Sequence, residues 1–193
     1  NMSSPKTRTR TAAADVRDQL LVAGRRILER DGETGLTVRA VAAEAGVAPM
    51  GVYNHFDGKE GLHDAVVTDG FAEFGRAIAA TDDDATARLL ASGLGYRAFA
   101  LANPVLYSLM FSSRCRPDDE TAARAFEVLV DIIRYAQVGG LLKPGDAEGL
   151  ALQVWSCVHG AVALELSGAL PPGADATAVY EDVLRLVTAG LGA

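Results

Sequence analysis

Residues 37–56 decide the fold of this chain, and they read TVRAVAAEAGVAPMGVYNHF. Over residues 38–45 the apolar side chains fall three and four positions apart, which is the spacing of one face of a short helix. Thr37 can cap this helix at its start, and Gly46 is suited to end it. A second short helix is predicted to open at Pro49, because proline in a first turn loses no hydrogen bond.

Two short helices joined by a glycine-containing turn form a helix-turn-helix. Val47, Val52 and Phe56 are assigned to its core. The spacing fits two interpretations equally well: a unit that reads DNA, and an ordinary three-helix packing unit with no DNA role.

An amphipathic helix is predicted before this motif, because apolar residues recur at helical spacing over residues 16–28. Asp15 is its expected N-cap, and Asp31-Gly32 its expected end. Before it, Lys6, Arg8 and Arg10 form a short basic arm. We therefore predict an arm over 1–14, a helix-turn-helix domain over 15–62 and a second domain over 63–193.

The second domain is also predicted to be helical, because caps and glycine or proline breaks separate its apolar segments. With the N-terminal three helices, the sequence predicts an all-α protein of about nine helices and no strand. The expected segments run from Asp57 to Ile78, 85–102, 105–111, 117–138, 144–167 and 175–191.

The last two predicted helices point to a partner. Twelve of the seventeen residues from Leu150 to Leu166 are apolar and surround the helix, which indicates burial on all sides. A four-helix interface between two identical chains would provide that burial, and a helix enclosed within one large monomer core is the alternative. The expected interface residues are Leu150, Val154, Val158, Val162, Val183 and Val187.

The charge of the chain is unevenly distributed. The formal net charge is −7, yet residues 1–65 hold nine of the 18 Lys and Arg and nine of the 25 Asp and Glu. The acidic excess therefore lies wholly beyond residue 65, and it does not argue against DNA binding by the N-terminal part.

The remaining composition bounds the class of protein. Cys115 and Cys157 are far apart and lack metal-binding spacing, so we expect two reduced thiols, with Cys157 buried. The apolar stretch 150–166 is interrupted by polar residues and is too short to span a bilayer. We expect a cytoplasmic protein without a membrane segment, metal or cofactor.

Residues 17–65 resemble the DNA-binding domain of the TetR family of bacterial regulators. The resemblance rests on the segment from Thr37 to Val47, on Val52-Tyr53-Asn54-His55-Phe56, and on Lys59-Glu60-Gly61-Leu62. The C-terminal part, from Leu101 to Phe111 and with Trp155-Ser156-Cys157-Val158-His159-Gly160, resembles TetR ligand-binding domains that carry a Trp-x-x-x-His-Gly signature.

This resemblance implies contacts with a double-stranded DNA operator. The family often has Ser or Thr where this chain has Ala48, and a small residue where it has Met50, so the operator sequence is left open. Tyr53 could instead pack partly into the core, and Arg8 and Arg10 could enter the minor groove or make no contact. The expected DNA-binding residues are Thr37, Arg39, Pro49, Met50, Gly51, Tyr53, Asn54, His55 and Lys59.

The resemblance also implies a cavity for a small hydrophobic or weakly polar effector. The alternative is that its aromatic residues form plain core, with Trp155 and His159 purely structural. His159, Tyr107 and Ser108 are the candidate polar anchors. The expected lining residues are Tyr96, Phe99, Leu106, Tyr107, Met110, Phe111, Phe126, Ile133, Trp155 and His159.

Together these patterns predict a homodimeric transcriptional regulator, expected to be a repressor that an effector releases from a palindromic operator. The rival is a dimeric small-molecule-binding protein with an idle helix-turn-helix. An enzyme is disfavoured because the sequence has no GxSxG motif and no glycine-rich phosphate loop after a strand. The effector, the operator, the target genes, and repression against activation stay open.

Overall fold

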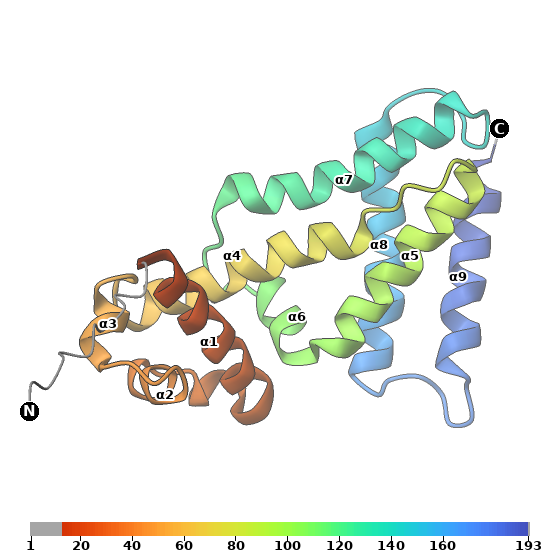
Figure 1. Cartoon of the computed structure of the whole chain (residues 1–193). Coiled ribbons are helices and arrows are strands. Elements are labelled where there is room, and N and C mark those ends of the chain that lie inside the picture. Colours follow the sequence, from red (N-terminus) through yellow and green to blue (C-terminus); the bar gives the residue numbers. More distant parts are fainter. Residues whose placement is uncertain (1–12, 193) are drawn as a thin grey trace, which may run out of the picture. The chain divides into compact units, whose positions relative to one another are not determined.

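The computed structural model describes residues 13–192 of the chain. Within them the regular elements are all helices, apart from an isolated bridge between Leu142 and Gly192. The predicted all-α class is confirmed (Figure 1). The helices are α1 (Ala13–Gly35), α2 (Val38–Glu44), α3 (Pro49–Tyr53), α4 (Gly58–Ile78), α5 (Ala85–Ala102), α6 (Pro104–Met110), α7 (Asp119–Val138), α8 (Ala147–Leu166) and α9 (Ala176–Leu191).

The chain divides into two compact units between Val66 and Val67, so that α4 begins in the first unit and ends in the second. The division lies four residues beyond the predicted one. Most of the predicted arm lies outside the described residues, and Ala13 and Ala14 already belong to α1.

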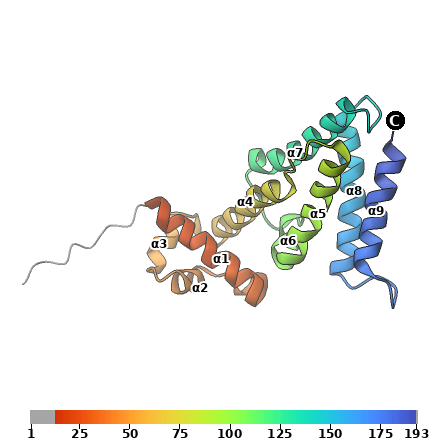
Figure 2. The ribbon, with the colours of Figure 1, turned by 45° about the vertical axis from the view of Figure 1, so that its right-hand side comes forward.

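The first unit is built on α1, which packs against α2 and α3 (Figure 2). Asp15 lies in the first turn of α1, so its prediction as the N-cap is wrong. Gly32 has φ 73° and interrupts the helix, as its predicted role at the helix end requires. Eight side chains of this unit's core are 0% exposed: Leu20, Ile27, Leu28, Leu36, Val41, Val52, Leu62 and Val66.

The turn between α2 and α3 depends on Gly46. Its φ is 68°, in the left-handed region that other residues adopt only with strain. After it, the Val47 N–H donates to the Ala42 carbonyl at 2.9 Å, and this hydrogen bond closes the turn that leads to α3. The predicted start of α3 is also confirmed, since Pro49 is its first residue and Ala48 precedes it without a side-chain cap.

The second unit contains α5 to α9 and the C-terminal part of α4. Four of its helices begin at an aspartate whose carboxylate accepts a backbone N–H in the first turn, which satisfies a donor that has no partner within the helix. These caps are Asp84, Asp118, Asp146 and Asp175.

Helix α8 occupies the centre of this unit and packs against α5, α7 and α9. In both ribbon views α8 and α9 run side by side (Figures 1 and 2). Within the described residues, α8 is the helix that is long and apolar enough to cross a membrane by length and composition alone. Those two properties do not distinguish a membrane span from the core helix of a soluble protein.

Helices α4 and α5 approach closely because Gly95 has no side chain. A Cβ atom at this position would lie 2.2 Å from the Ala77 carbonyl oxygen. Gly93, half a turn earlier, faces α9 instead, where a Cβ atom would meet Leu184 at 2.6 Å. These two glycines set how tightly α5 packs on its neighbours.

Candidate functional site

The first candidate site is the exposed side of the helix-turn-helix. The Thr37 side chain accepts the Ala40 backbone N–H at 3.2 Å, which confirms it as the cap of α2. Arg39 is exposed in the first turn of the same helix, and Lys59 is exposed in the first turn of α4. Both cations are thus free to meet an anionic partner.

Helix α3 presents its first turn to solvent. Met50 is 65% exposed and Tyr53 is 56% exposed, both high for large side chains with an apolar body. Tyr53 therefore does not pack into the core. Pro49 and Asn54 are also exposed, whereas Gly51 and His55 are half-buried. Of the residues assigned to the core, Val52 and Phe56 are buried and Val47 is half-buried.

His63, which sequence reasoning missed, ties α4 to the chain just before α2. The residue is only 7% exposed, and its Nε2 atom lies 2.9 Å from the Leu36 carbonyl oxygen. Leu36 directly precedes the cap Thr37. The bond therefore fixes the backbone directly before α2. The sequence contains no signal for this bond, because the partner is a backbone carbonyl 27 residues away.

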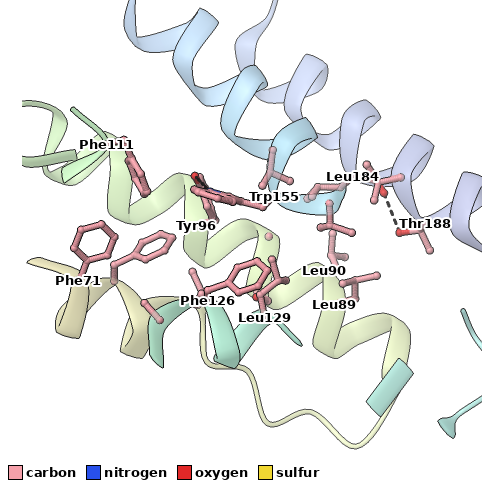
Figure 3. A pocket seen from close by; sticks show the side chains of 18 of the residues that line it. Phe71, Leu89, Leu90, Tyr96, Phe111, Phe126, Leu129, Trp155, Leu184 and Thr188 are labelled. Carbon is pink, nitrogen blue, oxygen red and sulfur yellow. Dashed lines mark hydrogen bonds between the residues drawn. The ribbon is translucent and has the colours of Figure 1, made fainter. Parts of the chain in front are cut away.

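The second candidate site is an apolar cavity of about 230 Å³ within the second unit (Figure 3). It is lined by the C-terminal part of α4 and by α5, α7, α8 and α9, with Phe111 directly after α6. Phe71, Tyr96, Phe111 and Trp155 gather at one end, and Leu89, Leu184 and Thr188 lie toward the other (Figure 3).

Four of the ten predicted ligand residues line this cavity: Tyr96, Phe111, Phe126 and Trp155. The other six do not line it. Tyr107 and His159 lie directly behind Tyr96, whereas the remaining four are buried core side chains: Phe99, Leu106, Met110 and Ile133. The anchor candidate Ser108 is exposed. Sequence spacing identified apolar helix faces but could not tell a cavity wall from solid core.

A closed cluster of polar groups lies behind the aromatic end of the cavity. The Tyr96 hydroxyl lies 2.8 Å from the Tyr107 hydroxyl and accepts the Trp155 Nε1–H at 3.1 Å. His159 Nδ1 lies 2.8 Å from the Tyr107 hydroxyl and 3.0 Å from that of Tyr96. The rings of Tyr107 and His159 are also stacked, with centroids 5.6 Å apart.

Burial fixes the protonation of this cluster. It raises the pKa of the Tyr96 hydroxyl and raises that of Tyr107 to about 12, so both keep their protons at neutral pH. Burial also lowers the pKa of His159, which favours its neutral form. A neutral imidazole can accept a hydrogen bond at Nδ1 when Nε2 carries the proton.

An ion pair that the sequence did not reveal joins α5 to α8. Arg97 donates from Nε to Glu165 Oε2 at 2.8 Å and from Nη2 to Glu165 Oε1 at 2.7 Å. The two side chains are 17% and 16% exposed. A third bond reaches Thr177 Oγ1 in α9 at 3.1 Å, so one guanidinium fastens three helices.

The outer face of α8 and α9 forms a shallow apolar groove, whose lining includes Cys157, Leu164, Val183 and Leu186. Leu186 is 72% exposed. Cys157 is exposed and Cys115 is buried, so the prediction that Cys157 is buried is wrong. The physical reason is that α8 is apolar all round, and Cys157 lies on the side that its own protomer leaves open.

Of the six predicted interface residues, Val154, Val183 and Val187 line this groove. Val154, Val158, Val162 and Val187 are buried within the protomer. Leu150 and Val183 are half-buried.

Comparison with known families identifies the kind of protein to which these two sites belong. The family model described as "Bacterial regulatory proteins, tetR family" matches residues 20–66, and the one described as "Tetracyclin repressor-like, C-terminal domain" matches residues 89–187. The chain belongs to the TetR family. It is a TetR-family transcriptional regulator with a DNA-binding helix-turn-helix, and regulators of this family bind DNA operators and small-molecule effectors as dimers.

Relatives support the same assignment over most of the chain. An uncharacterized HTH-type transcriptional regulator, Rv0681 of Mycobacterium tuberculosis, is 28% identical over 184 residues, which cover 91% of this chain and 81% of the relative. A protein of unknown function from Rhodococcus sp. RHA1 has a TM-score of 0.81 at 29% identity, covering 98% of this chain and 100% of that one.

A more distant solved structure shows the fold alone. The TetR transcriptional regulator SCO7222 of Streptomyces coelicolor has a TM-score of 0.71 at 21% identity and covers 91% of this chain and 96% of its own. In this TetR-family chain, residues 13–192 hold no group of three or more His, Cys, Asp or Glu side chains placed to bind a metal.

Proposed function

We propose that this regulator is a homodimeric repressor that leaves a palindromic operator when a small hydrophobic or weakly polar effector occupies its cavity. The observation that carries the proposal is that one chain combines an exposed recognition helix with a separate apolar cavity. An effector regulates DNA binding only if it binds one dimer geometry better than the other. We infer a cytoplasmic location, where such an operator would be found.

The exposed first turn of α3 supports base contacts. Pro49 and Met50 offer apolar contacts, for example to a thymine methyl group, and Gly51 allows close backbone approach. Tyr53, Asn54 and His55 supply hydrogen bonds to phosphates or base edges.

Cations and capped helix ends support phosphate contacts. Lys59 carries a positive charge at the start of α4, where backbone N–H groups also favour an anion. At the start of α2, Arg39 supplies the positive charge, and Thr37 caps the helix end whose backbone N–H groups favour an anion. Arg39 could also pair with guanine through two hydrogen bonds.

For the dimer, we propose the outer groove of α8 and α9 as the surface that a second copy covers. It is apolar, and regulators of this family are dimeric. The partner-facing residues are then exposed or half-buried ones such as Leu164, Val183 and Leu186. We also assign the C-terminal part to the Trp-x-x-x-His-Gly group, on Trp155, His159 and Gly160.

The test is fluorescence anisotropy of labelled DNA from upstream of the protein's own gene, at two salt concentrations. Selective binding that weakens steeply with salt is expected, because phosphate contacts release counterions. Lys59→Ala should reduce the slope of log K against log salt by about 1. Lys143→Ala is the matched control, since Lys143 is exposed in the second unit.

A failure of this test has a defined meaning. If binding is no tighter than to random DNA, a genome-wide selection of DNA fragments follows. An empty selection contradicts the repressor and favours the alternative, a dimeric ligand-binding protein with an idle helix-turn-helix.

A further inference from the structure

The chemistry of the cavity restricts which molecules can occupy it. Nineteen residues line it, all within the described part of the chain, and none of them is Asp, Glu, Lys, Arg or His. A charged ligand group would lose its hydration there without gaining an opposite charge, which is strongly unfavourable.

Four polar side chains border the cavity: Ser92, Tyr96, Trp155 and Thr188. The last three already form hydrogen bonds inside the protein. The Thr188 hydroxyl donates to the Leu184 carbonyl at 2.9 Å, shown as a dashed line in Figure 3. The Trp155 Nε1–H donates to the Tyr96 hydroxyl at 3.1 Å. An acceptor on a ligand therefore finds both of these donors engaged.

The hydrogen atoms of the tyrosine cluster are also accounted for. Trp155 donates to Tyr96, Tyr96 can donate to Tyr107, and Tyr107 can donate to Nδ1 of a neutral His159. This order uses the Trp155, Tyr96 and Tyr107 donors once each, and the remaining donor, the Nε2–H of His159, belongs to a residue that does not line the cavity. A ligand acceptor would have to break an existing bond to pair with one of these three donors.

The size of the cavity sets a further limit. An apolar cavity of about 150 Å³ lined by aliphatic and aromatic side chains binds benzene, so about 230 Å³ leaves room for a ring with a short substituent. Phe71, Phe74 and Phe111 supply edges and faces that favour an aromatic ring.

We propose that the occupant is an uncharged, predominantly hydrocarbon compound of the size of a singly substituted benzene ring. This inference rests on the proposed effector role of the cavity and narrows it to one chemical class. Neither carboxylates nor amides of the same shape belong to that class.

The chain provides its own reporter for this test. Trp155 lines the cavity and is the only tryptophan in the sequence. Its fluorescence is followed during titration of the full chain with isopropylbenzene, benzamide and benzoate, which have the same number of heavy atoms. Isopropylbenzene should give a saturable change below its solubility limit. The other two should bind at least about tenfold more weakly, because burying a carboxylate or an amide costs more free energy than burying a hydrocarbon group.

A pair of variants locates the binding. Ala122 lines the cavity and its neighbour Ala123 is exposed. Ala122→Phe fills the space and should abolish the isopropylbenzene response, whereas Ala123→Phe should keep it. If circular dichroism shows that Ala122→Phe does not fold, Val158→Phe on α8 fills the same cavity.

The results separate this inference from the repressor function. No saturable response to isopropylbenzene, equal binding of benzoate or benzamide, or an unchanged response in a folded cavity-filling variant would overturn the inference. If isopropylbenzene binds as expected but leaves operator affinity unchanged, the ligand class stands and its role as an effector fails. If operator affinity responds only to charged or amide compounds, the regulator stands and the hydrocarbon class fails.

Discussion

At the scale of single residues, His63 shows how a buried polar side chain can set the geometry of a neighbouring motif. Its Nε2 atom holds the Leu36 carbonyl at 2.9 Å in a region closed to water. A buried carbonyl that loses its partner costs free energy, because water cannot replace the bond.

We predict that His63→Ala lowers the free energy of unfolding by about 1–3 kcal/mol, from the unpaired carbonyl and the space left by the ring. Urea denaturation followed by circular dichroism measures this loss. His55→Ala, at a half-buried histidine in the same unit, is the matched control and should change stability less. Equal midpoints for the two variants would contradict the assigned role of His63.

His159 gives the second residue-scale prediction, which concerns pH. Burial lowers its pKa in the folded state, so the unfolded chain takes up a proton first as pH falls. The contribution of neutral His159 to the stability of the fold is therefore complete above the pKa that this residue has in the unfolded chain, about 6.5. It is lost as the pH falls through the lower pKa of the folded state.

Urea midpoints at pH 7.5 and pH 5.5 test this sign. The wild-type protein should be less stable at the lower pH, and His159→Gln, which still offers an acceptor but does not titrate, should show a smaller difference. The contribution of the buried tyrosines to stability depends on pH with the opposite sign. Since burial raises the pKa of Tyr107 to about 12, its contribution is complete below about pH 10 and is lost as pH rises through 12.

At the scale of helices, the packing of α5 on α4 depends on the missing side chain of Gly95. The Ala77 carbonyl oxygen occupies the place where a Cβ atom would lie, at 2.2 Å. Because this obstacle is backbone rather than a flexible side chain, the helices would have to move apart.

Gly95→Ala should therefore destabilise the protein by about 1–3 kcal/mol, the usual cost of overpacking, despite the better helix propensity of alanine. Differential scanning calorimetry measures the change. Gly51→Ala is the control, since its added methyl group would meet Val47 only at an ordinary contact distance of 3.6 Å. A Gly95→Ala protein as stable as wild type would show that α4 and α5 are not in tight contact here.

At the scale of the whole molecule, the outer groove of α8 and α9 should join two protomers. Leu186 is its most exposed large apolar side chain. Leu186→Glu places a charge on this surface, and an unpaired charge buried between two protomers is strongly unfavourable.

We expect Leu186→Glu to shift the protein from dimer to monomer in analytical ultracentrifugation, with its helical content unchanged. Ala178→Glu adds the same charge to an exposed position of α9 outside the groove and should leave the dimer intact. A Leu186→Glu protein that sediments as a stable dimer would exclude this groove as the interface.

The sequence by itself determined the helices and the family. Local chemistry specifies helix starts, so the cap Thr37 and the first-turn proline Pro49 were readable from a few neighbouring residues. The helix-turn-helix was readable because its turn, proline and apolar spacing lie within twenty residues.

Only the tertiary structure decided which faces meet. Helix α8 is apolar all round, so nothing in its sequence showed that Val158 faces inward and Cys157 outward. The partners of His63 and Arg97 likewise lie 27 and 68 residues away. The physical reason is that periodicity reports the character of a helix face, whereas the rotation of the helix against its neighbours depends on the packing of every side chain at once.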